Sequence, residues 1–382
     1  MFKKSLAAVA VLGAFAASSM AADVTLYGKV DMGLQYQNVE TTAWNGAETN
    51  EDALTLDSGV GQASRFGIKA TEDLGNGYKV TFKLENGFKA DDGSSLKDNR
   101  LFDREASLAV SSEWGTLMAG RFGAFSTAAS ATDILMSRVE SFDGGHTGAE
   151  LVMFGRQDNA IAYLSPKVAG FQAAAMYSFK GDKGENLGTA EDPIATREGH
   201  GDATRYAGFA VTYDIGALQT AVGYEQLIRS NKIEGQKDQK IVTFGGNYDF
   251  DMFKLYAAGQ YFEGATNVID YKDAKYATAD LDAAGIEGYG LHVGAKFDAL
   301  AGHFDTGIYF IDAEADRAGA EKDVDGQYFG IAGRYVYDLS KRTNIRTTLA
   351  YNQKTWDKVG ADDKDDFERN TYIAKVSLTH NF

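Results

Sequence analysis

The feature that most constrains the fold is a period-two alternation of apolar and polar side chains that recurs along most of the chain. In residues 24–37, one face is apolar throughout, and the other face carries charge, including Lys29 and Asp31. Because successive side chains of a β-strand point to opposite faces, such a segment separates an apolar environment from water. The same pattern returns in about sixteen segments, the last of which is residues 371–382.

The connections between these segments alternate in length. Tight turns such as residues 72–77 follow long polar loops such as residues 38–61 and 89–99. This rhythm is typical of a transmembrane barrel, whose strands need only about 10 residues each and alternate apolar-out and polar-in. Unpaired backbone groups are costly in lipid, so the last strand should pair with the first. We predict an all-β fold, a transmembrane up-and-down antiparallel β-barrel of about 16 strands.

Aromatic side chains cluster near the ends of several predicted strands. Rings of this kind suit the two interfaces between lipid and water, so we expect them to form girdles around the barrel. The residues concerned are Phe250, Phe253, Phe297, Phe304, Phe310, Tyr335 and Tyr337.

The first residues predict an export signal. Lys3 and Lys4 precede an apolar run at residues 6–17, and Ser19-Met20-Ala21 has the small-x-small pattern of a cleavage site. We therefore expect a signal peptide at residues 1–21 and a single transmembrane barrel domain at residues 22–382. Beyond this signal, no run of about 18 apolar residues predicts a membrane helix.

Charge and composition exclude several classes of function. The formal net charge is −16, and it becomes −18 once Lys3 and Lys4 are removed. Nucleic-acid binding needs a basic surface, so no nucleic-acid partner is expected. The chain contains no cysteine, which excludes disulfides, thiolate catalysis and cysteine metal sites. Acidic runs in the long loops lack the spacing of an EF-hand, and we interpret them as solvated surfaces. No cofactor is implied.

Residues 121–156 do not share the alternation. The stretch is long, apolar and poor in charge. Structureless loops of more than about 15 residues are uncommon in compact domains and are usually functional or disordered. This one is too apolar for a solvated tail. We expect a loop that is packed inside the barrel.

Seven short motifs occur along the chain, at residues 24–31, 64–77, 101–106, 115–121, 156–171, 339–343 and 380–382. Together they resemble the trimeric general porins of Gram-negative outer membranes, especially the proteobacterial branch. Residues 24–31 resemble the first strand of that family, and residues 64–77 resemble its second strand and turn closely.

This resemblance implies that the third extracellular loop, about residues 121–156, folds into the lumen and narrows the pore. Acidic residues on the loop would then face basic residues on the wall. The implied loop acids are Asp133, Glu140 and Asp143, and the implied wall residues are Lys29, Arg65, Arg104 and Arg156. Between Asp133 and Glu140 the sequence departs from the commoner loop pattern by inserted residues that include Arg138.

Alternation places Lys29 and Arg65 on the polar face. Arg104 instead shares its parity with Ala106, Leu108 and Val110. Either the phase of the alternation slips at this point, or protein covers both faces of the strand. Residues 101–112 thus lack a clean outward apolar face, which is a weak indication of a subunit contact.

The resemblance implies a water-filled channel in the outer membrane for passive diffusion of small hydrophilic solutes and ions. It also implies a homotrimer surrounded by outer-membrane lipid and lipopolysaccharide. Opposite charges across the narrowest point would favour polar solutes. Because the loop acids and the acidic outer loops oppose the wall arginines, we expect a modest cation preference.

Two other classes of function remain open at this point. One is an outer-membrane barrel enzyme of the protease or phospholipase type, which needs a nucleophile, a base and an orienting acid within reach. The five histidines are scattered and lack a matching serine motif, so no enzyme is predicted. The other class is an adhesin or a secreted sandwich, against which the lipid-compatible alternation argues.

Overall fold

The computed structural model describes residues 24–142, 151–181, 198, 203–229, 237–265, 268–269, 285–315, 324–357 and 366–382. Within these ranges lie seventeen strands and one short helix. They are β1 Thr25–Thr42, β2 Glu48–Ser58, β3 Arg65–Gly75, β4 Tyr78–Gly87, β5 Glu105–Ser112, β6 Gly115–Gly123, α2 Met136–Val139, β7 Arg156–Leu164, β8 Phe171–Ser178, β9 Arg205–Ile215, β10 Leu218–Ile228, β11 Gln239–Asp249, β12 Lys254–Ala265, β13 Ile286–Ala299, β14 Gly302–Ala315, β15 Val324–Ser340, β16 Thr343–Trp356 and β17 Phe367–Asn381.

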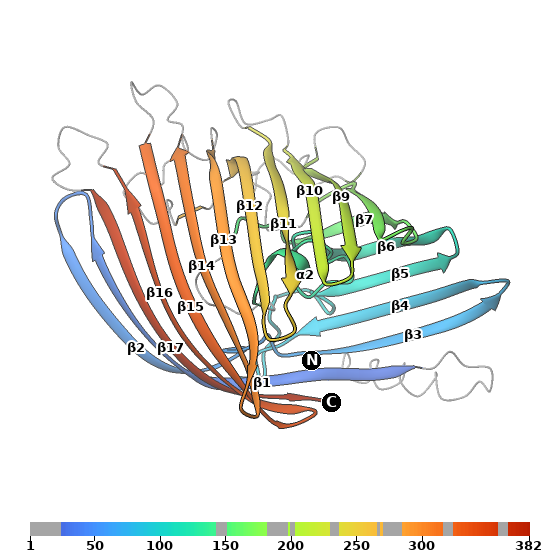
Figure 1. Ribbon diagram of the computed structural model, residues 1–382, viewed down its shortest axis with the longest axis horizontal. Coiled ribbons are helices and arrows are strands. Elements are labelled where there is room, and N and C mark those ends of the chain that lie inside the picture. The colour runs from blue at the N-terminus through green and yellow to red at the C-terminus, as the bar shows by residue number, and fades with distance from the viewer. Residues whose placement is uncertain are drawn as a thin grey trace.

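The strands form one closed antiparallel barrel (Figure 1). From β3 onward each strand pairs with the next, and β17 returns to β1 in a register that runs from Lys29 opposite Asn381 to Thr42 opposite Glu368. The predicted pairing of the last strand with the first is therefore confirmed. Closure satisfies the backbone groups that an open sheet would leave exposed to lipid.

The predicted polar loop at residues 38–61 is wrong. Strand β1 continues to Thr42, and Glu48–Ser58 returns beside it as β2. Strand β3 then pairs with the first residues of β1, where Arg65 lies opposite Lys29. Strands β2 and β3 are thus two parts of one wall strand, which gives the predicted sixteen. The alternation did not predict β2, because the first half of this strand, which includes Glu48 and Glu51, is exposed to water.

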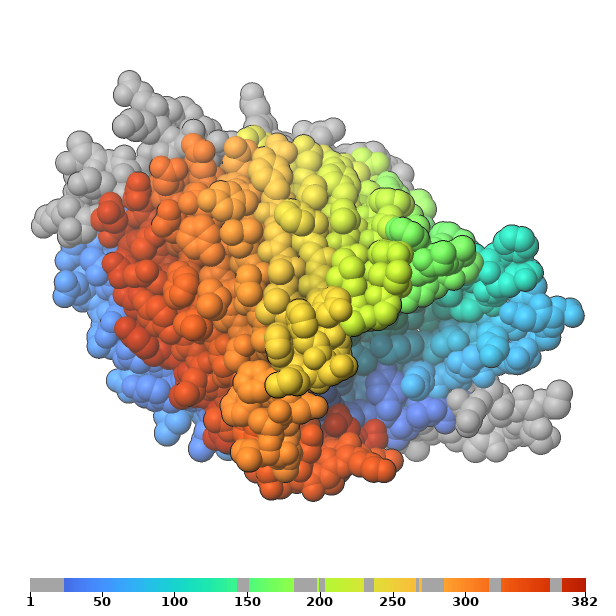
Figure 2. Space-filling model, in the orientation of Figure 1, coloured from blue at the N-terminus to red at the C-terminus, as the bar shows by residue number. Residues whose placement is uncertain are grey.

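The outer and inner faces follow the alternation. On β10, Val222 and Tyr224 are exposed on the outer face, whereas Ala221 and Glu225 are buried on the inner face. Figure 2 shows neighbouring strands packed into a continuous outer surface. Because the outer surface meets lipid, the apolar core of this protein lies inside the barrel rather than between two layers.

Aromatic pairs mark the end of the barrel where the turns are short. The rings of Phe250 and Phe253 stack with centroids 4.8 Å apart, and those of Phe297 and Phe304 lie 5.2 Å apart. Such rings are typical of a membrane interface. In the described part of the chain, no helix is long and apolar enough to cross a membrane.

Strand β5 begins only at Glu105, not at residue 101. Its outward positions Leu108 and Val110 are exposed, and Glu105 is buried on the opposite face. The strand therefore has an ordinary lipid-compatible face, and the expected indication of a subunit contact in residues 101–112 is wrong.

Candidate functional site

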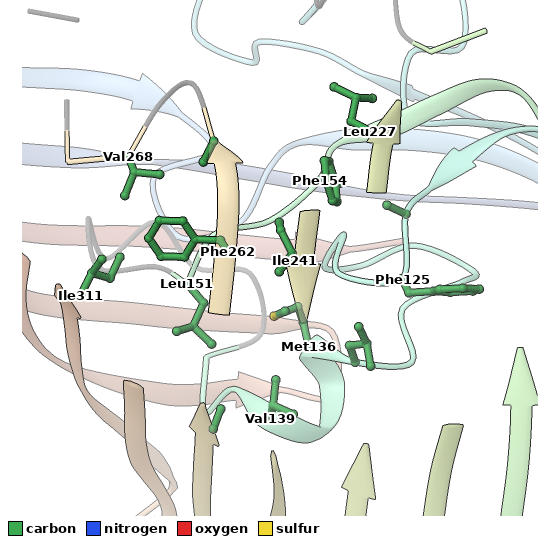
Figure 3. Close-up of a cluster of buried hydrophobic side chains, with 14 of the residues drawn as sticks. Phe125, Met136, Val139, Leu151, Phe154, Leu227, Ile241, Phe262, Val268 and Ile311 are labelled. Atoms are coloured by element: carbon green, nitrogen blue, oxygen red, sulfur yellow. The ribbon is translucent and has the colours of Figure 1, made fainter. Parts of the chain in front are cut away.

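The chain between β6 and β7 folds into the barrel, as the sequence predicts. We call residues 124–155 the inner loop; its residues 143–150 lie outside the described ranges. Figure 3 shows Phe125, Met136, Val139 and Phe154 among buried side chains of the wall. The wall side chains around them are Leu227, Ile241, Phe262 and Ile311. Full burial stabilises a large apolar side chain by about 1.5–3 kcal/mol, so this packing fixes the loop against β9–β14.

Glycines on the inner face of this wall make room for the loop. A Cβ atom at Gly223 would lie 2.5 Å from Cδ1 of Leu135, and one at Gly294 would lie 2.2 Å from Oγ of Ser141. A Cβ at Gly307 would approach Cε2 of Phe142 to 2.9 Å. Contacts this short force a displacement, so these three wall positions accept no side chain unless the loop moves.

Helix α2 is fixed near the short-turn end of the barrel. The Arg138 guanidinium donates from Nε to Oδ1 of Asp214 at 3.1 Å and from Nη2 to Oδ2 at 2.9 Å. Asp214 lies near the end of β9. Lys167, in the turn between β7 and β8, places its Nζ 2.6 Å from the same carboxylate. Asn247 on β11 donates to the Arg138 carbonyl oxygen at 2.9 Å. The inserted residue Arg138 thus attaches the loop to the wall.

The loop has further polar attachments on both sides of α2. Before the helix, the buried Glu225 carboxylate accepts from the Tyr206 hydroxyl at 2.6 Å and from the Ser126 N–H at 3.2 Å. After the helix, the Ser141 hydroxyl donates to the Thr306 carbonyl oxygen at 2.8 Å. Buried polar groups require partners of this kind, and together they specify one position for the loop.

Away from β9–β14, the inner face carries charges along β3–β5 and at the first residue of β7, and Glu85, Arg104 and Glu105 among them are buried. Arg104 donates from Nε to Oε1 of Glu85 at 2.7 Å, and Lys83 lies 2.8 Å from Oε2 of Glu105. Arg65 is close enough to Glu85, and Arg156 close enough to Arg104, for their charges to interact. We call Arg65, Lys83, Glu85, Arg104, Glu105 and Arg156 the wall cluster.

The wall cluster explains the parity of Arg104. This residue precedes β5, and its N–H donates to the Glu85 carbonyl oxygen at 3.2 Å. Its side chain meets Glu85 on the inner face, whereas Ala106 and Leu108 obey the regular alternation of β5. Of the two alternatives from the sequence, the structure favours a phase slip just before the strand.

A second charged group lies where the inner loop leaves the wall, and sequence reasoning missed it. Asp158 on β7 accepts two hydrogen bonds from Arg100, at 2.9 and 2.6 Å, and one from Arg121 at 2.8 Å. A left-handed Asn159, with φ of 49°, interrupts the alternation here. The acidic partner of these arginines was therefore not visible from periodicity.

The other predicted site residues occupy different surroundings. Lys29 lies opposite Arg65 in the β1–β3 register. Asp133 turns toward its own loop, where its carboxylate accepts from the N–H groups of Ala129 at 3.1 Å and Ser137 at 3.0 Å. Burial raises the pKa of Asp133. Glu140 is buried at the end of α2. Asp143 lies outside the described residues. The structure thus brings Arg65, Arg104 and Arg156 together, whereas the Asp133 carboxylate is hydrogen-bonded to its own loop.

Among the residues that the structure describes, no group of histidines and carboxylates is arranged to hold a metal ion. A closed sixteen-stranded barrel with a charged wall and an inward-folded loop defines a transmembrane diffusion channel.

Comparisons with known proteins agree with this class. A family model described as Gram-negative porin matches residues 7–355. An outer membrane porin of Bordetella pertussis is 31% identical over 392 residues, covering 91% of this chain and 94% of the relative. Outer membrane porin protein 32 of Delftia acidovorans is 27% identical, covering 91% of this chain and 89% of the relative.

Solved structures show the same fold. An anion-selective porin from Comamonas acidovorans has a TM-score of 0.65 at 23% identity and covers 94% of this chain and 100% of its own. The trimer form of OmpT, an outer membrane protein of Vibrio cholerae, has a TM-score of 0.59 at 16% identity, covering 95% and 100%.

This chain belongs to the Gram-negative porin family and is an outer-membrane channel, not an enzyme.

Proposed function

We propose that the inner loop and the wall cluster together form the constriction for passive diffusion of small hydrophilic solutes and ions. The observation that carries this proposal is the one-sided position of the loop. Its apolar side chains pack on β9–β14, and the charged wall cluster lies on another part of the wall, along β3–β5 and at Arg156. Solutes must then pass between a fixed loop and a charged wall, which selects by size and polarity.

Deleting residues 128–138 tests the loop. The deletion removes the first three of the four residues of α2, and with them Leu135 and Met136, which are fully buried. Single-channel conductance should rise, and sugars larger than those admitted by the wild type should pass. Heat-modifiable electrophoretic mobility would verify that the barrel still folds. Unchanged conductance in a folded variant would place the loop outside the permeation path.

Selectivity should follow the wall rather than the loop. In the wall cluster, the cations Arg65, Lys83, Arg104 and Arg156 outnumber the carboxylates Glu85 and Glu105. The Asp133 carboxylate is hydrogen-bonded within its own loop, and burial disfavours its charge. We therefore revise the cation preference expected from the sequence to an anion preference, which is also the property named for the Comamonas acidovorans porin. Reversal potentials in a potassium chloride gradient test this, and a cation-selective potential at high salt would contradict it.

The channel is further proposed to be a homotrimer. The support is the trimer form of the Vibrio cholerae neighbour and a hollow of about 430 Å³ on the outer face of β1 and β15–β17. The hollow is lined almost entirely by apolar groups, among them Tyr36, Ile331, Leu349 and Tyr372. The remaining outer surface would contact outer-membrane lipid, including lipopolysaccharide. Light scattering in mild detergent should give three times the chain mass, and a monomeric mass would overturn the trimer.

Export is proposed to remove residues 1–21. These residues lie outside the described ranges, and the proposal rests on the basic, apolar and small-residue pattern of the sequence. N-terminal sequencing of the protein from the outer membrane should begin at Ala22.

A further inference from the structure

The connection between β2 and β3 contains more residues than the barrel wall needs. Ser58 lies opposite Met32, and Arg65 lies opposite Lys29. Two residues separate these partners on β1, whereas six residues, 59–64, separate them on the other side. We call residues 59–64 the insert. A continuous strand would need only two of these six residues, so four leave the plane of the wall.

The insert lies on the inner side of the wall and is centred on Asp31, whose side chain is fully buried. The Gly61 N–H donates to Oδ1 of Asp31 at 2.9 Å. The Ser377 hydroxyl donates to Oδ2 at 3.1 Å, and the Thr379 hydroxyl donates to the same oxygen. Ser64 exchanges hydrogen bonds with the backbone N–H and carbonyl oxygen of Asp31.

The neighbours of these residues establish which face the insert covers. On β17, Val376 and Leu378 are exposed on the outer surface, so Ser377 and Thr379 point inward. A Cβ atom at Gly61 would lie 2.3 Å from Oγ of Ser377 and 2.8 Å from Cδ of Arg346. Gly61 therefore sits against inward side chains of β16, β17 and β1.

The insert is a packed element rather than a solvated loop. A buried carboxylate is costly unless it is hydrogen-bonded, and here the insert itself supplies one of the donors to Asp31. Val60 and Gln62 are also buried. On the long-loop side, Gly59, Val60 and Ala63 line a hollow of about 420 Å³. The hollow leaves open space on one side of the insert, and the hydrogen bond to Asp31 fixes its position.

We propose that the insert is a second constriction element, which narrows the lumen from the β16–β17–β1 side. It adjoins Lys29 and Arg65, so it lies at the height of the basic residues proposed for the constriction. The inner loop contacts β9–β15, a different part of the wall. The inference rests on the proposed diffusion function, but it does not depend on the inner loop.

Deletion of residues 60–63 is the direct test, because it restores a continuous register. Gly59 would then lie opposite Asp31, and Ser64 opposite Val30, without a shift in the flanking pairs. Because ion flow depends on the dimensions and lining of the narrowest segment, conductance should rise roughly 1.5-fold. Equal conductance of the deletion variant and the wild type, with heat-modifiable mobility retained, would overturn the inference.

A second variant covers the case in which the deletion fails to fold. The chain has no cysteine, so Ala63→Cys provides a unique thiol in the hollow. A charged methanethiosulfonate reagent should reduce the current of this variant. The matched control is Asp52→Cys on the exposed β2, where the same reagent should leave the current unchanged. Complete labelling of Ala63→Cys, verified by mass spectrometry, without loss of current would also overturn the inference.

The two proposals fail in different ways. If the wild type forms no channel in a planar bilayer, the proposed function is wrong. If the wild type conducts and deletion of residues 128–138 raises its conductance, while both insert variants behave as wild type, only the role of the insert is wrong.

Discussion

The two walls that face each other across the lumen have opposite chemistry. Inward positions of β9–β14 include Ala221, Gly223 and Ile241, which are buried beneath the inner loop. Inward positions of β3–β5 include Glu85 and Glu105, which are held by arginine and lysine. In a simple porin barrel the whole inner face would be polar. The difference shows that the inner face of each strand is adapted to the groups that it contacts, apolar loop side chains in one case and charged wall residues in the other.

The strongest test of the covered wall is Leu135→Ala. Leu135 is fully buried against Gly223, so its truncation leaves a cavity and should cost about 2–5 kcal/mol of unfolding free energy. Unfolding by denaturant in detergent measures the loss, and open-channel current noise should increase as the loop loosens. The matched control is Val222→Ala on the lipid-facing side of the same strand. Equal losses in the two variants would contradict the packing of the loop on this wall.

The wall cluster is tested by Arg104→Gln. This change removes the ion pair with Glu85 and should cost about 1.5–3 kcal/mol, because Lys83 still lies 3.6 Å from the same carboxylate. Loss of one positive charge should move the reversal potential toward cations. Glu85→Gln is the reciprocal control and should move the potential toward anions. A reversal potential that responds to neither change would remove the wall cluster from the permeation path.

The attachment of α2 to the turn is tested by Arg138→Ala. Its ion pair with Asp214 is partly exposed, so the expected cost is only about 1 kcal/mol. Arg138→Lys keeps the charge but loses the bidentate geometry and should restore part of the stability. Thermal unfolding of the two variants in detergent provides the comparison. If Arg138→Ala unfolded at the same temperature as the wild type, apolar packing alone would hold the helix.

The smallest effect is expected for Asp133→Asn. The carboxylate loses one of two backbone hydrogen bonds, but burial raises its pKa and disfavours its charge, so the net cost should stay below about 1 kcal/mol. The reversal potential should remain close to the wild-type value, because burial disfavours the charge of this carboxylate. A clear shift toward anions would mean that Asp133 does contribute charge to the lumen.

Sequence alone determined the architecture. Alternation identifies which side chains meet lipid, so the barrel, its closure and the inward position of Lys29 followed from residues such as Val30, Asp31 and Leu378. The same reasoning failed where a strand extends beyond the membrane and where the regular alternation is interrupted. Strand β2 was missed because water surrounds the part of it near the long loops. Alternation left the side of Arg104 open because the phase slips just before β5.

Only the tertiary structure decided how the lumen is divided. Loop composition predicted that residues 121–156 are packed inside, but not which wall receives them. That choice depends on Leu135 meeting Gly223 and on Arg138 meeting Asp214, residues more than seventy positions apart. The insert depends likewise on Asp31 joining Gly61 to Ser377. A local pattern reports the environment of one strand, whereas contacts of this kind exist only after closure brings distant strands around one lumen.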